Sequence, residues 1–276
     1  MSAANEIIGL VPSGGYGKRM RPIKVWKELI HVGYKKVKIG ESMKNIPKVV
    51  SEYTVENMIE AGAKKIIMIL NDQKFDIFRY FEDGSQYGAS IVYTCQNADS
   101  GFTGMPIAID TAYPWIQNKT VLMGMPDTIV DPYDSFKHLL KSHQDQESDL
   151  TLGVLPTNCP QRLAPVVFDE VTSEVRDIFD KPKSTQIYNT WCMAVWSGRF
   201  TELLHSFVNQ VKDGSRPCEK EIILSDVFRE SLRQGLKVYA RYFPKGSFHD
   251  LGDVNEFISS RIKIEKATIS EEAMNV

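Results

Sequence analysis

A glycine-rich turn followed by many basic side chains lies near the start of the chain. The segment GLVPSGGYGKRMRPIKVWKEL, residues 9 to 29, begins as an apolar run and turns through Gly14, Gly15 and Gly17. Glycine lets backbone N–H groups approach phosphate oxygens closely, because it has no Cβ and tolerates unusual dihedral angles. Five cations follow before the first carboxylate: Lys18, Arg19, Arg21, Lys24 and Lys27. A backbone cradle beside this much positive charge suits a polyphosphate.

Two well-defined phosphate-binding motifs do not fit this turn. The P-loop pattern GxxxxGK[ST] would place its first glycine at Pro12 and its hydroxyl at Arg19, and neither residue matches. The dinucleotide pattern GxGxxG, started at Gly15, would place its third glycine at Met20, and Pro22 prevents a clean helix start there. A solvated basic loop without a ligand stays open as the alternative, since runs of charge are usually surface features.

The composition of the whole chain restricts the class of partner. The 276 residues include 33 basic and 35 acidic side chains, a net charge of −2, which gives no global field for binding nucleic acid or an anionic membrane. Apolar runs such as IIMIL are too short to span a bilayer. The four cysteines form no Cys-x-x-Cys pair and the N-terminus lacks a signal-peptide pattern, so we expect a cytoplasmic protein with free thiols.

The elements that must position the turn follow an alternating pattern. Segments of helical character separate short β-rich runs at 6–12, 64–70, 89–95, 119–124 and 149–155. This alternation predicts an α/β fold whose central sheet is mixed but mainly parallel and is flanked by helices. A helix is expected over 47–62, starting at Pro47 and ending at Gly62.

The second half of the chain also contains both predicted strands and predicted helices. We expect strands near 165–169, 174–179, 190–196 and 236–243, helices near 199–212 and 221–234, and a last helix with a capping box from Asp253 to Glu256. No linker rich in proline, glycine or serine interrupts the pattern. A single domain over 1–276 is therefore expected.

Six segments of the chain match, in order, the motifs of one known enzyme family. The opening motif LAGGxGTRLxP followed by PKxL is matched at Gly14, Gly15, Gly17, Arg19, Pro22, Lys27 and Leu29. The later segments are FEDGSQYGASIVYTCQ ending at Gln96, GMPIA from Gly104, LMGMPDTIV with Asp127, DKP with Lys181, and SFHDLGDVNEF with Asp250. Together they extend from residue 6 to about residue 262, and they resemble the motifs of the sugar-1-phosphate nucleotidylyltransferases, such as the glucose-1-phosphate thymidylyltransferases.

The resemblance implies a Rossmann-like nucleotidyltransferase fold and a specific reaction. A sugar-1-phosphate oxygen attacks the α-phosphorus of a nucleoside triphosphate, which releases pyrophosphate and forms a nucleoside-diphosphate sugar. The implied roles are catalysis by Arg19 and Lys27; nucleotide binding by Gly14, Gly15, Gly17, Gln96 and Gly104; sugar-phosphate binding by Lys181; and Mg²⁺ binding by Asp127 and Asp250. Carboxylate and phosphate oxygens are the ligands that Mg²⁺ prefers, and one or two protein carboxylates normally suffice.

Some positions depart from the family pattern and keep other hypotheses open. Lys18 replaces a threonine of the loop, Trp26 replaces the proline before Lys27, and Trp191 replaces a small residue. These changes motivate a second hypothesis, a regulatory homologue that binds nucleotide without turnover. A related glycosyltransferase is a third, although the chain has no Asp-x-Asp metal motif after a strand. The motifs do not distinguish dTTP, UTP or CTP as the nucleotide substrate. Such enzymes are commonly homo-oligomers.

Overall fold

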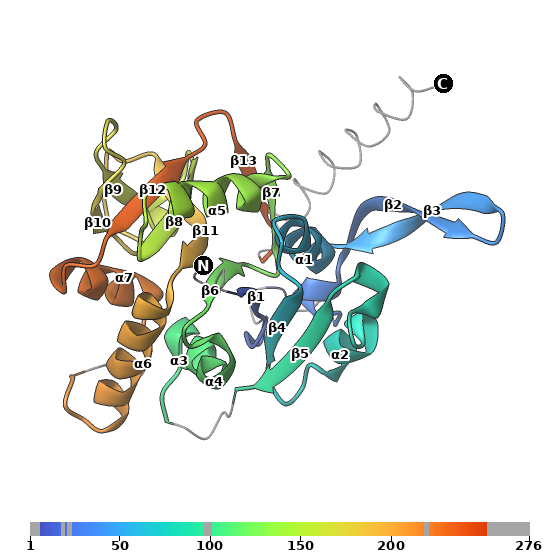
Figure 1. The fold of residues 1–276 in the computed structure, drawn as a ribbon, viewed down its shortest axis with the longest axis horizontal. Coiled ribbons are helices and arrows are strands. Elements are labelled where there is room, and N and C mark those ends of the chain that lie inside the picture. The colour runs from blue at the N-terminus through green and yellow to red at the C-terminus, as the bar shows by residue number, and fades with distance from the viewer. Residues whose placement is uncertain (1–5, 18–19, 21–23, 97–100, 218–220, 253–276) are drawn as a thin grey trace, which may run out of the picture.

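A seven-stranded mixed sheet forms the centre of the computed structural model, which describes residues 6–17, 20, 24–96, 101–217 and 221–252 (Figure 1). The strand order is β12-β8-β11-β6-β1-β4-β5. The bounds are β1 Ile7–Pro12, β4 Lys65–Leu70, β5 Ser90–Cys95, β6 Thr120–Gly124, β8 Leu150–Pro156, β11 Asn189–Trp196 and β12 Val238–Tyr242. All neighbouring pairs are parallel except those of β11, which runs antiparallel to β6 and β8. The predicted α/β fold with a mixed, mainly parallel sheet is confirmed.

Helices cover both faces of this sheet because its central strands are apolar on both sides. In β1, Ile8 and Leu10 belong to one buried cluster, whereas Val11 belongs to the other. The first cluster packs against α3 Met105–Asp110, α4 Tyr113–Ile116, α6 Gly198–Lys212 and α7 Leu224–Arg233. The second packs against α1 Val50–Glu60, α2 Phe75–Phe81 and α5 Ser135–Asp145. Near-continuous apolar strands are typical of a sheet buried on both faces.

Three small antiparallel ribbons surround the central sheet. Strand β7 Thr128–Asp131 pairs with β13 Ser247–Asp250, and β9 Val166–Phe168 pairs with β10 Val175–Ile178. The third ribbon, β2 His31–Ile39 with β3 Ser42–Val49, projects from the body (Figure 1). A short 3₁₀ segment, η2 Lys27–Leu29, precedes β2. In the described part of the chain, no helix has both the length and the apolar character needed to cross a membrane.

The structure corrects one predicted boundary. The helix expected from Pro47 begins at Val50, because residues 42–49 form strand β3 opposite β2. Pro47 pairs across the ribbon with Tyr34, and proline is tolerated in a ribbon whose outer edge needs no N–H donor. The predicted last helix from Asp253 onward lies outside the described residues.

A buried histidine makes the stability of this fold sensitive to acid. His143 on α5 is only 6% exposed, and its Nδ1 lies 2.9 Å from Ser148 Oγ and 3.1 Å from Thr151 Oγ1. Burial lowers the pKa of His143 from 6.5 to about 4, against the smaller opposing effect of Asp149. The folded protein therefore holds the neutral imidazole over a pH range in which the unfolded chain takes up a proton.

The free energy of unfolding is expected to fall in that range. The stabilisation from neutral His143 is complete above pH 6.5 and is lost as the pH falls toward 4. Between about pH 7.5 and about pH 5 this one group should remove about 2 kcal/mol. Urea unfolding of the wild type and of His143→Gln at both pH values measures it. The wild type should lose that much more than the variant; equal losses would contradict the assignment.

Candidate active site

A cavity of about 340 Å³ opens at the carboxyl edge of the parallel strands. From β1 the chain passes to β4 and β5 on one side, and then returns to β6 on the other side of β1. The crevice beside such a switch in strand order is the usual ligand site of open α/β sheets. The lining residues are Pro12, Gly14, Gly15, Tyr16, Lys27, Glu28, Gln96, Thr103, Gly104, Met105, Ala108, Met125, Pro126, Asp127 and Glu221.

The glycine-rich turn after β1 forms one wall of the cavity. A Cβ on Gly14 would lie 2.8 Å from Gln96 Oε1, so a larger residue at this position would displace the end of the Gln96 side chain. Gly15 also lines the cavity, and a Cβ there would meet no atom within 4 Å. Gly17 has a φ of +60°, which glycine adopts readily, but it is not among the lining residues. Gly14, Gly15 and Gln96 are therefore brought together.

Gly104 stands at the start of α3 on the opposite wall. Its φ is +117°, and a Cβ would lie 2.0 Å from the backbone oxygen of Ile222. The Ile222 N–H donates to Thr103 O at 2.8 Å, so two distant segments touch through their backbones here. Only glycine fits this contact. The sequence placed Gly104 in a nucleotide-binding motif but gave no indication of the second segment.

Lys27 and Asp127 form an ion pair at the base of the cavity. Lys27 begins η2, and its Nζ donates to Oδ2 of Asp127, which follows β6. Burial alone would lower the pKa of the Lys27 ammonium, but the carboxylates of Asp127, Glu28 and Asp250 together raise it above the usual lysine value. Lys27 is therefore a fixed positive charge at neutral pH.

Asp250 reaches the same place from the other end of the described chain. It ends β13, where it pairs with Thr128 of β7, and the next residue's N–H donates to Asp127 O at 2.8 Å. Its Oδ1 accepts a hydrogen bond from the Gly252 N–H at 2.7 Å. The antiparallel ribbon thus carries Asp250 next to Asp127, and the Lys27 ammonium responds to both carboxylates.

A second, deeper ion pair supports this arrangement and was not predicted from the sequence. Lys74 and Glu28 are both fully buried, and Lys74 Nζ lies 2.6 Å from Glu28 Oε1. The same ammonium donates to Ser13 O at 2.7 Å and lies 5.2 Å from the centre of the Trp26 ring. Burial lowers the pKa of Lys74, while Glu28 opposes that shift. Lys74 follows β4. Its position after a predicted strand is the sequence feature that could have indicated a role near the site.

Glu28 also presents an unused acceptor. Its Oε2 is buried and has no hydrogen-bond partner within the part of the chain that the structure describes, and Glu28 lines the cavity. A buried carboxylate oxygen without a partner is costly, and a ligand or solvent donor would relieve that cost.

Other predicted site residues lie apart from this cluster or beyond the description. Lys181 is exposed, in a loop after β10, and is not among the residues that line the cavity. Its φ of +43° is unusual for a residue other than glycine, and its N–H donates to Leu163 O at 2.8 Å. Arg19 lies outside the described residues, as does Lys18. Trp191 packs edge to face against Phe228, with ring centres 5.2 Å apart, and belongs to the core.

The donor set at the base of the cavity fits a hard divalent cation. Asp127 and Asp250 offer carboxylate oxygens, and Mg²⁺ commonly binds through one or two carboxylates together with phosphates and water. No group of three or more His, Cys, Asp or Glu side chains in the described ranges is arranged to hold a metal ion. The charges also favour an added cation, because Lys27 and Lys74 face the three carboxylates of Glu28, Asp127 and Asp250.

Solved structures with the same fold include proteins that are named as nucleotide transferases or pyrophosphorylases. A Bacillus anthracis protein named as a glucose-1-phosphate thymidylyltransferase superposes with a TM-score of 0.77 at 15% identity, covering 94% of this chain and 95% of its own. UDP-glucose pyrophosphorylase with UDP-glucose gives 0.76 at 18% identity, covering 95% and 99%. The inositol-1-phosphate CTP transferase of T. maritima gives 0.70 at 15% identity, covering 97% and 98%. At these identities the likeness shows the fold alone.

Sequence relatives and a family model give the wider context. Mannose-1-phosphate guanyltransferase of Yarrowia lipolytica is 23% identical over 187 residues, and that of Kluyveromyces lactis is 26% identical over 180 residues. Each match covers 63% of this chain but less than half of the relative, 44% and 45%. The family model described as nucleotidyl transferase matches residues 8–267. The predicted resemblance is confirmed, and the chain belongs to the nucleotidyl transferase family.

Proposed function

We propose that this protein joins a nucleoside triphosphate to a sugar-1-phosphate, with release of pyrophosphate. The observation that carries the proposal is the Lys27 ammonium paired with Asp127, under the electrostatic influence of Asp250, in a cavity lined by Gly14, Gly15 and Gly104. The family and the names of its relatives support the same reaction class.

The proposed reaction is a direct transfer between the two substrates and needs no covalent intermediate with the protein. An oxygen of the sugar phosphate forms a bond to the α-phosphorus, and the bond from that phosphorus to the β-phosphate oxygen breaks. Two anions must meet, so the barrier is mainly charge repulsion and orientation. Lys27 lies where it can hold the triphosphate, and its raised pKa keeps it charged. By resemblance to the family motif, Arg19 supplies a second cation.

Asp127 and Asp250 are the residues that would hold Mg²⁺. When bound, the ion would screen phosphate charge and help to orient the triphosphate. The two carboxylates come from different parts of the chain, yet the β7 and β13 ribbon fixes them side by side. A ligand pair held by paired strands is preorganised, which limits the reorganisation needed when phosphate arrives.

The cavity walls suit a nucleotide base and its sugar. Gln96 projects from the end of β5 against Gly14, and its amide offers both a donor and an acceptor to a base edge. Gly104, Met105 and Ala108 form the facing wall. The relatives and fold neighbours are named for guanyl, thymidylyl, uridyl and cytidyl compounds, so the base is left to experiment.

Lys181 is proposed as the sugar-phosphate ligand. A lysine backbone in the left-handed region costs about 1 kcal/mol or more, and one use of such strain is to fix a side chain at a functional site. Here the Lys181 N–H bond to Leu163 O fixes that conformation. Exposure leaves the ammonium accessible to an incoming phosphate.

Lys74 is proposed as a positioning residue. It does not line the cavity, but it bonds both the backbone after β1 and the Glu28 side chain next to Lys27. It therefore fixes the glycine-rich turn relative to the catalytic lysine. A fully buried pair transmits small displacements, because close-packed surroundings leave no room for either side chain to relax.

The proposed reaction predicts pyrophosphate release from the right substrate pair. The protein should be incubated with Mg²⁺, each of GTP, UTP, CTP and dTTP, and a panel of sugar-1-phosphates, and one pair should release pyrophosphate. Asp127→Asn, Asp250→Asn and Lys27→Ala should each reduce that rate by roughly 10²-fold or more, while the far-UV circular dichroism spectrum stays that of the folded wild type. The exposed Asp145→Asn is the matched control and should retain the wild-type rate. Nucleotide binding without turnover for every pair would instead favour the regulatory homologue.

Removing one partner of the ion pair between Lys74 and Glu28 should destabilise the fold more than removing both charges. Lys74→Met leaves the Glu28 charge buried without a partner and should lower the free energy of unfolding by about 3 kcal/mol. The double variant Lys74→Met with Glu28→Gln removes both charges and should recover most of that loss. Urea titration followed by tryptophan fluorescence measures all three proteins. If the single and double variants are equally unstable, the pair is not the origin of the effect.

A further inference from the structure

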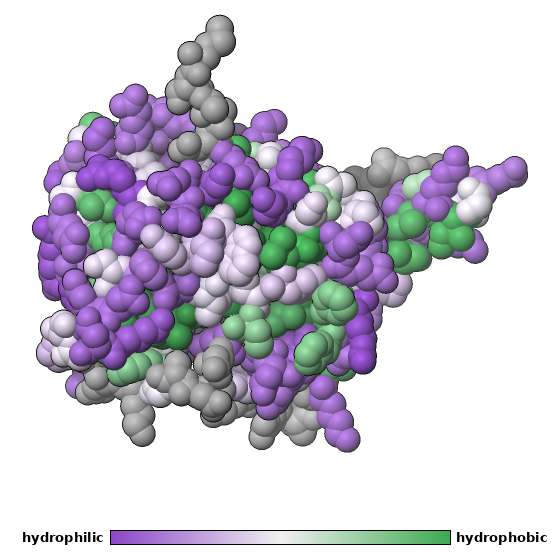
Figure 2. All heavy atoms as spheres, turned by 60° about the horizontal axis from the view of Figure 1, so that its bottom comes forward, coloured by the Kyte–Doolittle hydropathy of each residue, from purple (hydrophilic) through white to green (hydrophobic). Residues whose placement is uncertain are grey.

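The projecting ribbon is a second feature that calls for a function. We define the arm as residues His31–Val49, which comprise β2, β3 and the turn between them. It extends well beyond the body, and apolar side chains are visible along its surface (Figures 1 and 2). Tyr34, Ile39 and Met43 are 54%, 48% and 61% exposed. An isolated two-stranded hairpin is marginally stable in water, so a cover for these side chains would stabilise it.

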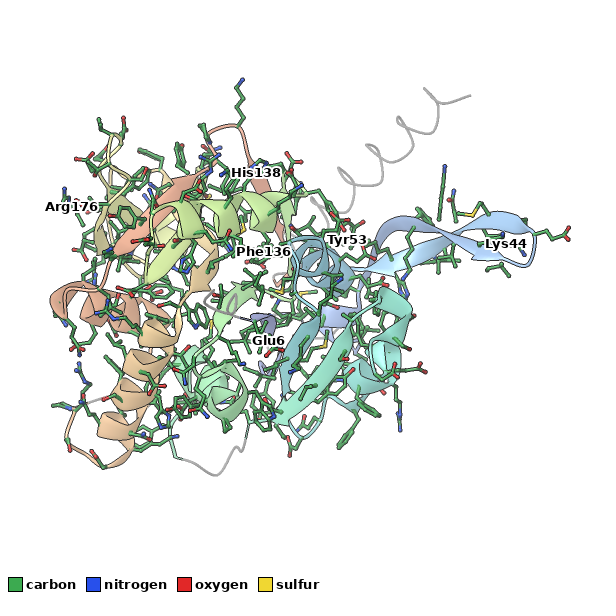
Figure 3. All side chains as sticks on the ribbon, in the orientation of Figure 1. Glu6, Lys44, Tyr53, Phe136, His138 and Arg176 are labelled. Carbon is green, nitrogen blue, oxygen red and sulfur yellow. The ribbon has the colours of Figure 1, made fainter. Side chains whose placement is uncertain are left out.

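The base of the arm is firmly fixed to the body. Lys35 forms an ion pair with the buried Glu52 of α1, and Lys48 forms one with Glu56. Tyr53 Oη donates to Val32 O at 2.9 Å. Figure 3 shows Tyr53 at this base, whereas Lys44 lies out on the arm, away from the body. The arm is therefore held in a defined direction, as a docking element requires.

The charge of the arm is opposite to that of the remaining chain. The arm contains five lysines and one glutamate, a net charge of +4, whereas the whole chain carries −2. The residues outside the arm therefore carry −6. Lys35 and Lys48 are paired at the base, which leaves Lys36, Lys38 and Lys44 for an external partner. A surface that combines acidic and apolar side chains would complement the arm.

Such a surface lies on α2. We define the α2 face as Asp72, Phe75, Asp76, Phe78 and Glu82, all of which are exposed. The exposed Arg79 pairs with Asp76, so the three carboxylates and this one cation leave the face with a net negative charge. Phe75 and Phe78 are 65% and 49% exposed, one helical turn apart. Helix α2 lies at the same end of the molecule as the arm (Figure 1). The connection is direct, because Glu52, which pairs with Lys35 of the arm, also accepts a hydrogen bond from Tyr80 of α2.

We propose that two copies of this chain form a symmetric dimer in which the arm of each copy covers the α2 face of the other. A two-fold axis repeats the contact, so each copy contributes one arm and one α2 face and the assembly closes. The tip of the arm, about 20 Å of strand from its base, is long enough to cross to a partner. Tyr34, Lys36, Lys38 and Met43 lie on one face of the ribbon. The lysines of this face meet aspartates and a glutamate, while Tyr34 and Met43 meet Phe75 and Phe78. This assembly is independent of the proposed reaction.

A charge swap tests the dimer directly. The arm variant carries Lys36→Glu and Lys38→Glu, and the α2-face variant carries Asp76→Lys and Glu82→Lys. Each variant alone brings like charges together at both contacts and should weaken self-association by roughly 10²-fold or more. Mixed in equal amounts, they should form a heterodimer, because one contact has both charges reversed and the other is wild type. Sedimentation velocity of the full chain measures all of these states.

A variant on α5 is the control for the charge swap. Lys137→Glu with Lys141→Glu on α5 makes the same change in net charge as the arm variant and should leave the dimer intact. A wild-type protein that is monomeric at all concentrations overturns the proposal, as does an arm variant that still dimerises or a mixture that fails to recover. A monomeric wild type that binds vesicles of phosphatidylcholine and phosphatidylserine would assign the arm to a membrane instead.

Discussion

The contact between Lys74 and Glu28 is the constraint on which the geometry of the site depends. One buried ammonium joins the end of β1, through Ser13 O, to the carboxylate beside Lys27. Removing water from both charges is costly, and only their short contact and the added backbone acceptor offset that cost. Because neither side chain can move without leaving an unpaired buried charge, the glycine-rich turn and η2 keep one relative position. The cationic and acidic groups of the cavity are arranged around that fixed point.

Much of the fold followed from local patterns in the sequence. The strands of the central sheet were predictable because each is a short apolar run buried on both faces, as in IIGLVP and KIIMIL. The arm was not, because its strands bury no continuous face and lysines alternate with apolar residues on both sides. Pro47 then indicated a helix start, although the residues around it pair across the ribbon. The rule for a proline at a helix start was outweighed by strand pairing.

The site was predictable where its residues carry a motif and not where they depend on contacts between distant segments. Gly14, Lys27, Gln96 and Asp127 could be named because each follows a recognisable strand or turn. Lys74 could not, because a lysine after a strand is usually exposed, and its burial arises from the positions of Ser13 and Glu28. The same reasoning applies to Glu221, which reaches the cavity through the backbone contact between Thr103 and its own segment.

The ribbon formed by β7 and β13 has a consequence for how the protein matures on the ribosome. Asp250 is synthesised about 120 residues after Asp127, so the acidic pair is incomplete until nearly all of the described chain has emerged. Until then Asp127 can already pair with Lys27, which is much closer to the N-terminus. Strand β12, Val238–Tyr242, is made just before β13, so the central sheet and the acidic pair are completed almost together.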